Sequence, residues 1–298
     1  MRIVVGASTF GAAGGPAVQM LEEHNIEIIK NPYGRKLTIE ETIEHLKGAD
    51  GLLAGLEPLT EEVLSQAPDL RAIARIGIGM DNVDKVACER HGIKVSNTPD
   101  APTEAVAEMA LSALLSIAHQ IPASNADMHE GCWNKRMGFS LKGLNVLFIG
   151  YGRIGRKFAD HLKYLGSNII VYDPYQPEIS IPSLEEGLAQ ADVVTIHASG
   201  KDEILGASEI DSIKDGAVLL NCARGTLVDE KVVYNALKSG KLSYYWADVY
   251  NEEPYKGILT ECDNALLTPH ISTFSKQCRI QMEVEAVNNI LCDLGVIA

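Results

Sequence analysis

The segment NVLFIGYGRIG, residues 145–155, decides how this 298-residue chain folds. A run of apolar residues leads into three glycines with the spacing G-x-G-x-x-G, at Gly150, Gly152 and Gly155. This order predicts a buried strand, a tight turn and the start of a helix. A glycine at 152 lets the backbone approach a pyrophosphate, and the N–H groups at the helix start favour phosphate. The segment therefore predicts a dinucleotide-binding unit that begins almost halfway along the chain.

An acidic residue supports this interpretation and predicts which dinucleotide binds. Asp173 ends the next apolar run, 18 residues after Gly155. A carboxylate there can accept hydrogen bonds from ribose hydroxyls and would repel a 2′-phosphate. Residues 174–176 carry no positive charge, so we expect NAD rather than NADP. Besides Asp173, the expected cofactor-binding residues of this region are Gly150, Gly152, Arg153, Ile154 and Gly155.

Short β-branched runs alternate with helical segments on both sides of the glycine motif. This spacing indicates βαβ units and parallel sheets. Eleven runs are many for one open sheet, and the chain is long for one domain, so the sequence predicts an α/β fold with two doubly wound parallel-sheet domains. The runs lie at 2–7, 26–30, 51–55, 72–77, 93–97, 145–150, 168–173, 192–197, 217–222, 244–249 and 265–269.

Two helical segments indicate how the domains are divided. The segment 103–120 is apolar all round, so we expect it to be buried at the domain junction or against another subunit. Residues after 275 are helix-like and too few for a domain, so they should return to cover the first sheet. The dinucleotide-binding domain would then be inserted into the other one. The expected bounds are 1–98 with 276–298 for the outer domain, and 99–275 for the inserted domain.

Composition excludes some partners. The formal net charge of −14 argues against nucleic acid or an anionic membrane, because both need a basic face. The six cysteines show no C-x-x-C pair or metal-ligand spacing, so no metal site is expected. With no secretory signal and no apolar run near 18 residues, we expect a reduced, soluble, cytoplasmic protein.

Further motifs carry a family resemblance over nearly the whole chain. The sequence resembles the D-isomer-specific 2-hydroxyacid dehydrogenase family, and most closely its phosphoglycerate dehydrogenase-like branch without a C-terminal regulatory domain. The resemblance implies a flavodoxin-like substrate domain with an inserted Rossmann NAD-binding domain, and a homodimer formed through the 103–120 helix. The motifs are GIGMDNVD (77–84), GYGRIG (150–155), LLNCARGTLVDE (219–230), ADVYNEEP (247–254) and LLTPHIS (266–272).

The resemblance also implies roles for particular residues. Arg224 would hold the substrate's carboxylate and 2-oxo group, His270 would be the general acid/base, and Glu253 its carboxylate partner. Asp248 would lie near the nicotinamide end of the cofactor. The cofactor pocket would also be lined by Cys222, Ala223, Arg224 and His270.

Chemistry explains these residue types independently of the family. Hydride that arrives at a 2-oxo carbon leaves an alkoxide, which needs a proton from a positioned group such as imidazolium. A neighbouring carboxylate favours the charged imidazolium. A guanidinium is always charged and can grip a carboxylate with two parallel hydrogen bonds.

The far end of the substrate is where the resemblance is weakest. Many relatives have Arg-Ser where this chain has Gly55-Leu56, and Asn where it has Pro102. Arg75, and Lys135 or Arg136, could supply positive charge for an anionic end, although ordinary surface or interface roles fit these residues equally well. Because glycine allows close approach, we expect backbone N–H groups near Gly77 to hold the substrate's carboxylate. The expected substrate-binding residues are Arg75, Ile76, Gly77, Ile78 and Arg224.

Three functions remain open at this stage. The first is an NAD-dependent oxidoreductase for a small D-2-hydroxy acid, with a 3-phosphoglycerate-like or phosphonate-bearing substrate among the candidates. The second is a glyoxylate/hydroxypyruvate-type 2-oxo acid reductase. The third, of another class, is an NAD-sensing interaction protein similar to the corepressors of the family, which keep the same three catalytic residues.

Overall fold

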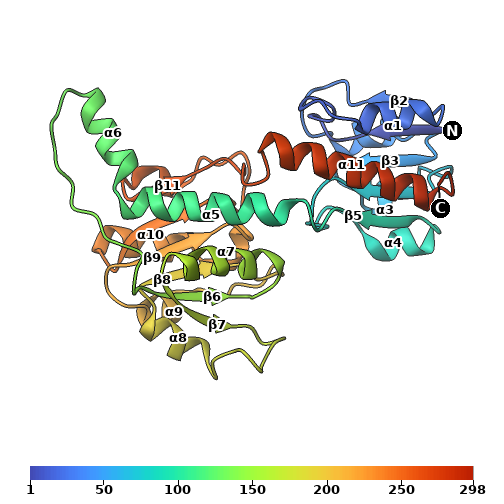
Figure 1. The fold of residues 1–298 in the computed structure, drawn as a ribbon. Coiled ribbons are helices and arrows are strands. Elements are labelled where there is room, and N and C mark those ends of the chain that lie inside the picture. Colours follow the sequence, from blue (N-terminus) through green and yellow to red (C-terminus); the bar gives the residue numbers. More distant parts are fainter. Residues whose placement is uncertain (298) are drawn as a thin grey trace. The chain divides into compact units, whose positions relative to one another are not determined.

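Eleven strands in residues 1–297, the part of the chain that the computed structural model describes, form two parallel sheets (Figure 1). The first sheet has the order β2-β1-β3-β4-β5 and the second β11-β10-β9-β8-β6-β7. Each expected run contains one strand, and the two doubly wound α/β sheets are confirmed. The strands are β1 (Arg2–Val5), β2 (Glu27–Lys30), β3 (Gly51–Ala54), β4 (Ala72–Arg75), β5 (Lys94–Asn97), β6 (Asn145–Ile149), β7 (Asn168–Tyr172), β8 (Val193–Ile196), β9 (Ala217–Asn221), β10 (Leu242–Ala247) and β11 (Ala265–Leu267).

The chain divides into two units with one sheet each. The first unit consists of Met1–Pro102 and the segment that begins at Thr273, and the second is Thr103–Ser272. These divisions lie a few residues from the bounds expected at 98 and 276. The long helix α5 (Pro102–Ala118) starts almost at the first division. The last helix, α11 (Lys276–Asp293), follows the second division and is capped by the Ser275 hydroxyl.

Helices cover both faces of the first sheet. Val4, Leu52 and Ile73 pack with the side chains of α2, α3 and α4 in one buried cluster. The other face is covered by α1 and α11. At Gly51 a Cβ atom would lie 2.9 Å from Ile290 Cδ1, so the absent side chain lets α11 approach β3 closely. The helices are α1 (Ala17–Glu23), α2 (Ile39–His45), α3 (Glu61–Leu64) and α4 (Lys85–Arg90).

The second sheet is also covered on both faces. Phe148 and Trp246, both fully buried, belong to a cluster with α5 and α7. The opposite cluster joins the sheet to α8, α9 and α10. Continuous apolar runs in β6, β8 and β9 fit strands buried on both sides. The remaining elements are α6 (Ile121–His129), α7 (Arg153–Tyr164), α8 (Leu184–Gln190), α9 (Ala207–Ser212), α10 (Glu230–Ser239) and two short 3₁₀ turns, η1 (Gly225–Leu227) and η2 (Ile258–Glu261).

The helix α5 is the expected apolar helix of 103–120. Its Ala107, Ala110 and Leu114 side chains are buried in the core of the second unit. Within residues 1–297, no single helix is long and apolar enough to cross a membrane, and only α5 and α6 taken together, bent by 60°, meet that criterion.

Candidate active site

The glycine motif forms the turn from β6 into α7. Gly150 has a φ of +88°, and a Cβ atom there would lie 2.7 Å from the backbone nitrogen of Ala198. A Cβ atom on Gly155 would lie 2.9 Å from the Gly150 carbonyl oxygen, so both positions require glycine. Gly152 begins the helix without a side-chain cap, and a Cβ atom there would meet open space. The turn therefore leaves room at the helix start for a pyrophosphate.

The start of α7 lies next to the half-buried His197, because a Cβ atom on Gly155 would lie 3.5 Å from the Cβ atom of His197. Arg153 and Ile154 form the first turn of α7, where Arg153 is exposed and Ile154 is half-buried. The His197 ring stacks on Phe148, and its Nε2 lies 2.9 Å from Thr195 Oγ1. Burial lowers the pKa of His197 to about 3, so this ring is neutral at physiological pH.

The Asp173 carboxylate follows β7 and is almost buried, with 6% of the residue exposed. It accepts hydrogen bonds from the backbone N–H groups of Tyr151 (2.8 Å) and Tyr175 (2.9 Å) and from Gln176 Nε2 (2.8 Å). Burial alone would raise the pKa of Asp173, but these donors and the charge of Arg156 outweigh it and keep the pKa below its ordinary value. The carboxylate is therefore charged, and about one of its four acceptor positions remains for a ribose hydroxyl.

Arg156 is a neighbour of Asp173 that the sequence analysis missed. Its guanidinium lies over the Tyr151 ring, 5.1 Å from the ring centroid, and donates to Gln176 Oε1. Residues 174–176, which follow Asp173, carry no positive charge, and this cation comes instead from α7. The G-x-G-x-x-G-R sequence contains the residue, but only the folded helix shows which way it faces.

His270 and Glu253 form a hydrogen-bonded pair after the carboxyl ends of β10 and β11. His270 Nδ1 lies 2.9 Å from Glu253 Oε2 and 3.1 Å from Oε1. The backbone of His270 has a φ of +54°, a left-handed conformation that is uncommon outside glycine and is a feature of functional sites. The imidazole side chain is 45% exposed, and within residues 1–297 Nε2 makes no hydrogen bond. The ring can therefore exchange a proton at Nε2.

Several groups keep Glu253 ionised. Burial alone would raise its pKa, but the hydrogen bond and charge of His270, the Tyr250 N–H group (3.2 Å) and the charge of Arg224 together hold the pKa below its ordinary value. The carboxylate is a hydrogen-bond acceptor at neutral pH and fixes the proton of His270 on Nδ1. Arg224 acts electrostatically on Glu253, so the three expected catalytic residues lie near one another.

The loop after β9 is held by Asn221, a buried residue that the sequence analysis did not single out. Its Oδ1 accepts from the Ala223 N–H group (3.0 Å) and its Nδ2 donates to the Arg224 carbonyl (2.9 Å). Arg224 Nη1 in turn donates to the Ala223 carbonyl at 2.7 Å. Burial raises the pKa of the adjacent Cys222 thiol to about 12, so this cysteine is no thiolate nucleophile. The feature of the sequence that could have revealed this role is the amide residue Asn221 at the end of an otherwise apolar run.

Asp248 binds the segment that carries His270. The residue is 1% exposed, and Oδ1 accepts from Thr268 Oγ1 (2.6 Å) and the Ile271 N–H group (2.9 Å). Oδ2 accepts from Ser272 N (2.9 Å) and Ser272 Oγ (2.5 Å). These contacts bracket His270 on both sides. In the structure Asp248 therefore fixes the loop of the proposed acid/base.

The first unit has Arg75 and the glycine-rich loop at the end of β4. Arg75 Nη1 donates to the Ile76 carbonyl, and Gly77, with a φ of +140°, leaves the space that the guanidinium fills. The Ile76 N–H donates to Ala54 O (2.9 Å), and the Gly77 N–H donates to Thr98 Oγ1 (2.7 Å). Both protons are thus used within the unit, and the expectation that this loop binds a substrate carboxylate stays a prediction.

Ile76, Gly77 and Ile78 were expected to bind the substrate, and of their three backbone N–H groups that of Ile78 remains to be described. Within residues 1–297 its N–H group makes no hydrogen bond, and its side chain is among the exposed large apolar ones. The glycines on either side give a ligand access to this backbone.

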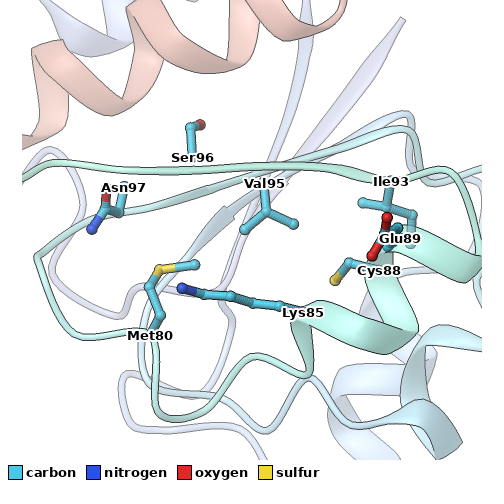
Figure 2. Close-up of a pocket in the computed structure, with 8 residues that line it drawn as sticks. All are labelled: Met80, Lys85, Cys88, Glu89, Ile93, Val95, Ser96 and Asn97. Atoms are coloured by element: carbon cyan, nitrogen blue, oxygen red, sulfur yellow. The ribbon is translucent and has the colours of Figure 1, made fainter. Parts of the chain in front are cut away.

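A separate hollow of about 330 Å³ lies in the first unit beside the edge strand β5 (Figure 2). Lys85 extends across it toward Met80, and the Cys88 thiol, whose pKa burial raises to about 11, faces it from α4. None of the expected site residues lines this hollow. Within residues 1–297, no group of three or more His, Cys, Asp or Glu side chains is placed to hold a metal ion.

Comparison with known proteins identifies the family. Residues 111–272 match the model of the D-isomer specific 2-hydroxyacid dehydrogenase, NAD binding domain. The chain belongs to this family. The matched residues make up most of the second unit, which is therefore the NAD-binding domain, and NAD is its cofactor. The glycine turn and the ionised Asp173 described above fit that cofactor.

Members of the D-2-hydroxyacid dehydrogenase family resemble the chain over most of its length. It is 37% identical to a D-3-phosphoglycerate dehydrogenase of Methanocaldococcus jannaschii over 85% of this chain and 51% of that protein. It is 33% identical to a hydroxypyruvate reductase of Thermotoga maritima over 80% of this chain and 82% of that protein. The chain thus spans about half the length of the phosphoglycerate dehydrogenases that it matches.

Solved structures agree with this assignment. The TT0316 protein of Thermus thermophilus superimposes with a TM-score of 0.90 at 32% identity, over 99% of this chain and 97% of that one. The two-unit α/β architecture is therefore that of the family.

Proposed function

We propose that this protein is an NAD-dependent dehydrogenase that interconverts a D-2-hydroxy acid and its 2-oxo acid. The observation that carries the proposal is the hydrogen-bonded His270–Glu253 pair, which lies in the same unit as the dinucleotide turn. When bound, NAD supplies or accepts the hydride. The protein's own task is to hold the substrate and to move the proton that accompanies the hydride.

We propose that His270 Nε2 carries out the proton transfer, and the hydrogen-bonded pair supports this role. In the direction of reduction, Nε2 donates a proton to the oxygen at C2 as the carbonyl becomes an alcohol. Glu253 holds the ring by Nδ1 and stabilises the imidazolium before the proton leaves. In the direction of oxidation, Nε2 accepts the same proton.

Charged and backbone donors would hold the acid. Arg224 is proposed to bind the substrate's carboxylate and 2-oxo group, since a guanidinium fits a planar carboxylate. The first unit is proposed as the substrate domain, with the Ile78 N–H group as a donor to the carboxylate. A short 2-oxo acid is the substrate class that these groups support, and the phosphoglycerate dehydrogenase and hydroxypyruvate reductase relatives leave its far end open.

The test is NADH oxidation by the purified protein with a panel of 2-oxo acids, from glyoxylate and pyruvate to hydroxypyruvate and 3-phosphohydroxypyruvate. His270→Gln should lower kcat by about 10²- to 10⁴-fold, the usual contribution of a general acid. His24→Gln is the matched control, because His24 is exposed and lies in the first unit. NADH binding without turnover of any acid would instead favour the NAD-sensing alternative.

We also propose a homodimer that includes α5 and the segment after it. Support comes from large apolar side chains that the chain leaves exposed there: Ile121, Met128, Trp133 and Met137. Light scattering at micromolar concentration should give twice the mass of one chain. Trp133→Asp should shift the mass toward the monomer, and a monomeric wild type would contradict the proposal.

We propose a cytoplasmic location because the cysteines are not joined in disulfides. All six are free thiols in the structure, as expected in a reducing compartment. Cell fractionation with antibodies to the protein would test this, and recovery in a membrane or extracellular fraction would contradict it.

A further inference from the structure

The hydroxyl of Tyr250 has no part in the mechanism above, yet it lies at the ends of the two strands that lead to the His270–Glu253 pair. The residue follows β10, which ends at Ala247. Its hydroxyl donates a shared hydrogen bond to the carbonyls of Ala247 and Thr268, each at 3.0 Å. Ala247 is the last residue of β10 that is paired with β11. The hydroxyl therefore joins the carboxyl ends of these two strands.

The contact with Thr268 connects the hydroxyl to His270. The Thr268 carbonyl accepts the Tyr250 hydroxyl and also the His270 N–H group, which lies 3.0 Å away. His270 has a φ of +54°, a conformation that costs free energy in a residue other than glycine and persists only where the surrounding structure holds it. One carbonyl group thus links the Tyr250 hydroxyl to the strained backbone of the proposed acid/base.

The backbone of Tyr250 contacts the segments of the other two catalytic residues. Its N–H group donates to Glu253 Oε1 at 3.2 Å. A Cβ atom on Gly225, the residue after Arg224, would overlap the Tyr250 carbonyl carbon, so the loop after β9 packs directly on this backbone. The Tyr250 ring stacks on the Tyr255 ring, with 4.2 Å between the ring centroids. Tyr250 is therefore held in place by its own neighbours and contacts all three catalytic segments.

We propose that Tyr250 is a positioning residue: its hydroxyl holds the His270 segment against the Glu253 segment, so that the imidazole stays aligned for proton transfer to the oxygen at C2. This inference rests on the proposed function, to which it adds a residue. A small displacement of an acid/base lowers the rate of the chemical step far more than it lowers substrate binding. Burial raises the pKa of Tyr250 to about 12, so the hydroxyl keeps its proton and remains a donor at neutral pH.

The test measures the first turnover after the protein loaded with NADH is mixed with the best 2-oxo acid, because this rate excludes product release. Tyr250→Phe keeps the ring and the backbone N–H group but removes the hydroxyl. It should slow the first turnover at saturating acid by about three- to tenfold, the range expected of one hydrogen bond. NADH binding and the acid concentration at half-maximal rate should not change. Tyr234→Phe is the matched control, because Tyr234 is half-buried in the same unit and its hydroxyl donates to Glu261 (3.3 Å). It should leave the rate unchanged.

A double-mutant cycle separates positioning from a general structural effect. If Tyr250 acts through the His270–Glu253 pair, adding Tyr250→Phe to Glu253→Ala should slow the first turnover by less than about twofold. An equal fold loss in both backgrounds would overturn the inference. So would an unchanged first turnover in a Tyr250→Phe protein that has the thermal transition of wild type. Either result leaves the proposed function standing, whereas a wild type that turns over no 2-oxo acid removes the proposed function and this inference with it.

Discussion

At the scale of single residues, Asp173 and Arg156 decide which dinucleotide the NAD-binding domain prefers. The ionised carboxylate repels a 2′-phosphate, while Arg156, one turn into α7, supplies a cation beside it. Asp173→Ser should therefore raise the kcat/KM ratio of NADPH to NADH by about tenfold or more. Asp160→Ser, on the exposed side of α7, is the control. An unchanged ratio in a folded Asp173 variant would contradict this account of cofactor choice.

His197 gives a second prediction at this scale, a dependence of stability on pH. Burial lowers its pKa in the folded protein to about 3, whereas in the unfolded chain it is near 6.5. Between these values the unfolded chain binds one more proton, so stability rises with pH and is lost as the pH falls below about 6.5. As the pH is lowered from about 6.5, the free energy of unfolding of wild type should therefore fall more steeply than that of His197→Gln. The two slopes should differ by up to about 1.4 kcal/mol per pH unit. Urea unfolding at pH 6, 5 and 4 measures both slopes, and parallel curves would count against a neutral buried ring.

At the scale of elements, the segment after β11 depends on Asp248. Asp248→Ala would leave the buried Ser272 hydroxyl and the backbone N–H groups of Ile271 and Ser272 without an acceptor. We expect it to lower the free energy of unfolding by about 3 kcal/mol, and to lower turnover because His270 loses its support. Urea unfolding measures the first effect. Glu252→Ala, in an exposed loop, should change stability by less than about 0.5 kcal/mol. Equal stability of the two variants would show that Asp248 has no such role.

Elements were well predicted from the sequence, because each strand is a short apolar run bounded by polar or glycine residues. The run NVLFIG predicted β6 and its turn, and the helix-like end of the chain predicted α11. Side-chain directions were the part that could not be predicted. Nothing in the stretch IGIGMDNVD (76–84) indicates that the Ile76 and Gly77 N–H groups already have acceptors, and nothing in GLEPLT (55–60) indicates that Glu57 is buried. Those facts depend on contacts with residues far away in the sequence, such as Thr98 and Gly6.

At the scale of the whole molecule, the two units should differ in their ability to fold alone. The second unit, Thr103–Ser272, is continuous and contains two buried clusters of its own. We expect the fragment 103–272 to unfold cooperatively and to bind NADH without turning over any acid. The fragment 1–102 should not fold, because it lacks α11, whose Met282, Ala286 and Ile290 are buried in the first unit. Circular dichroism in urea distinguishes the two, and co-expression with 273–298 should restore folding. A cooperative transition of 1–102 alone would contradict the division.

The central claim is hydride transfer between NAD and C2 of a D-2-hydroxy acid, with the proton supplied by His270. Its most direct test is reduction of the best 2-oxo acid by NADH that carries deuterium at both C4 positions. The account predicts a product with one deuterium at C2 and the D configuration, formed by wild type and almost lost in His270→Gln. A product of L configuration, or one without deuterium at C2, would contradict it.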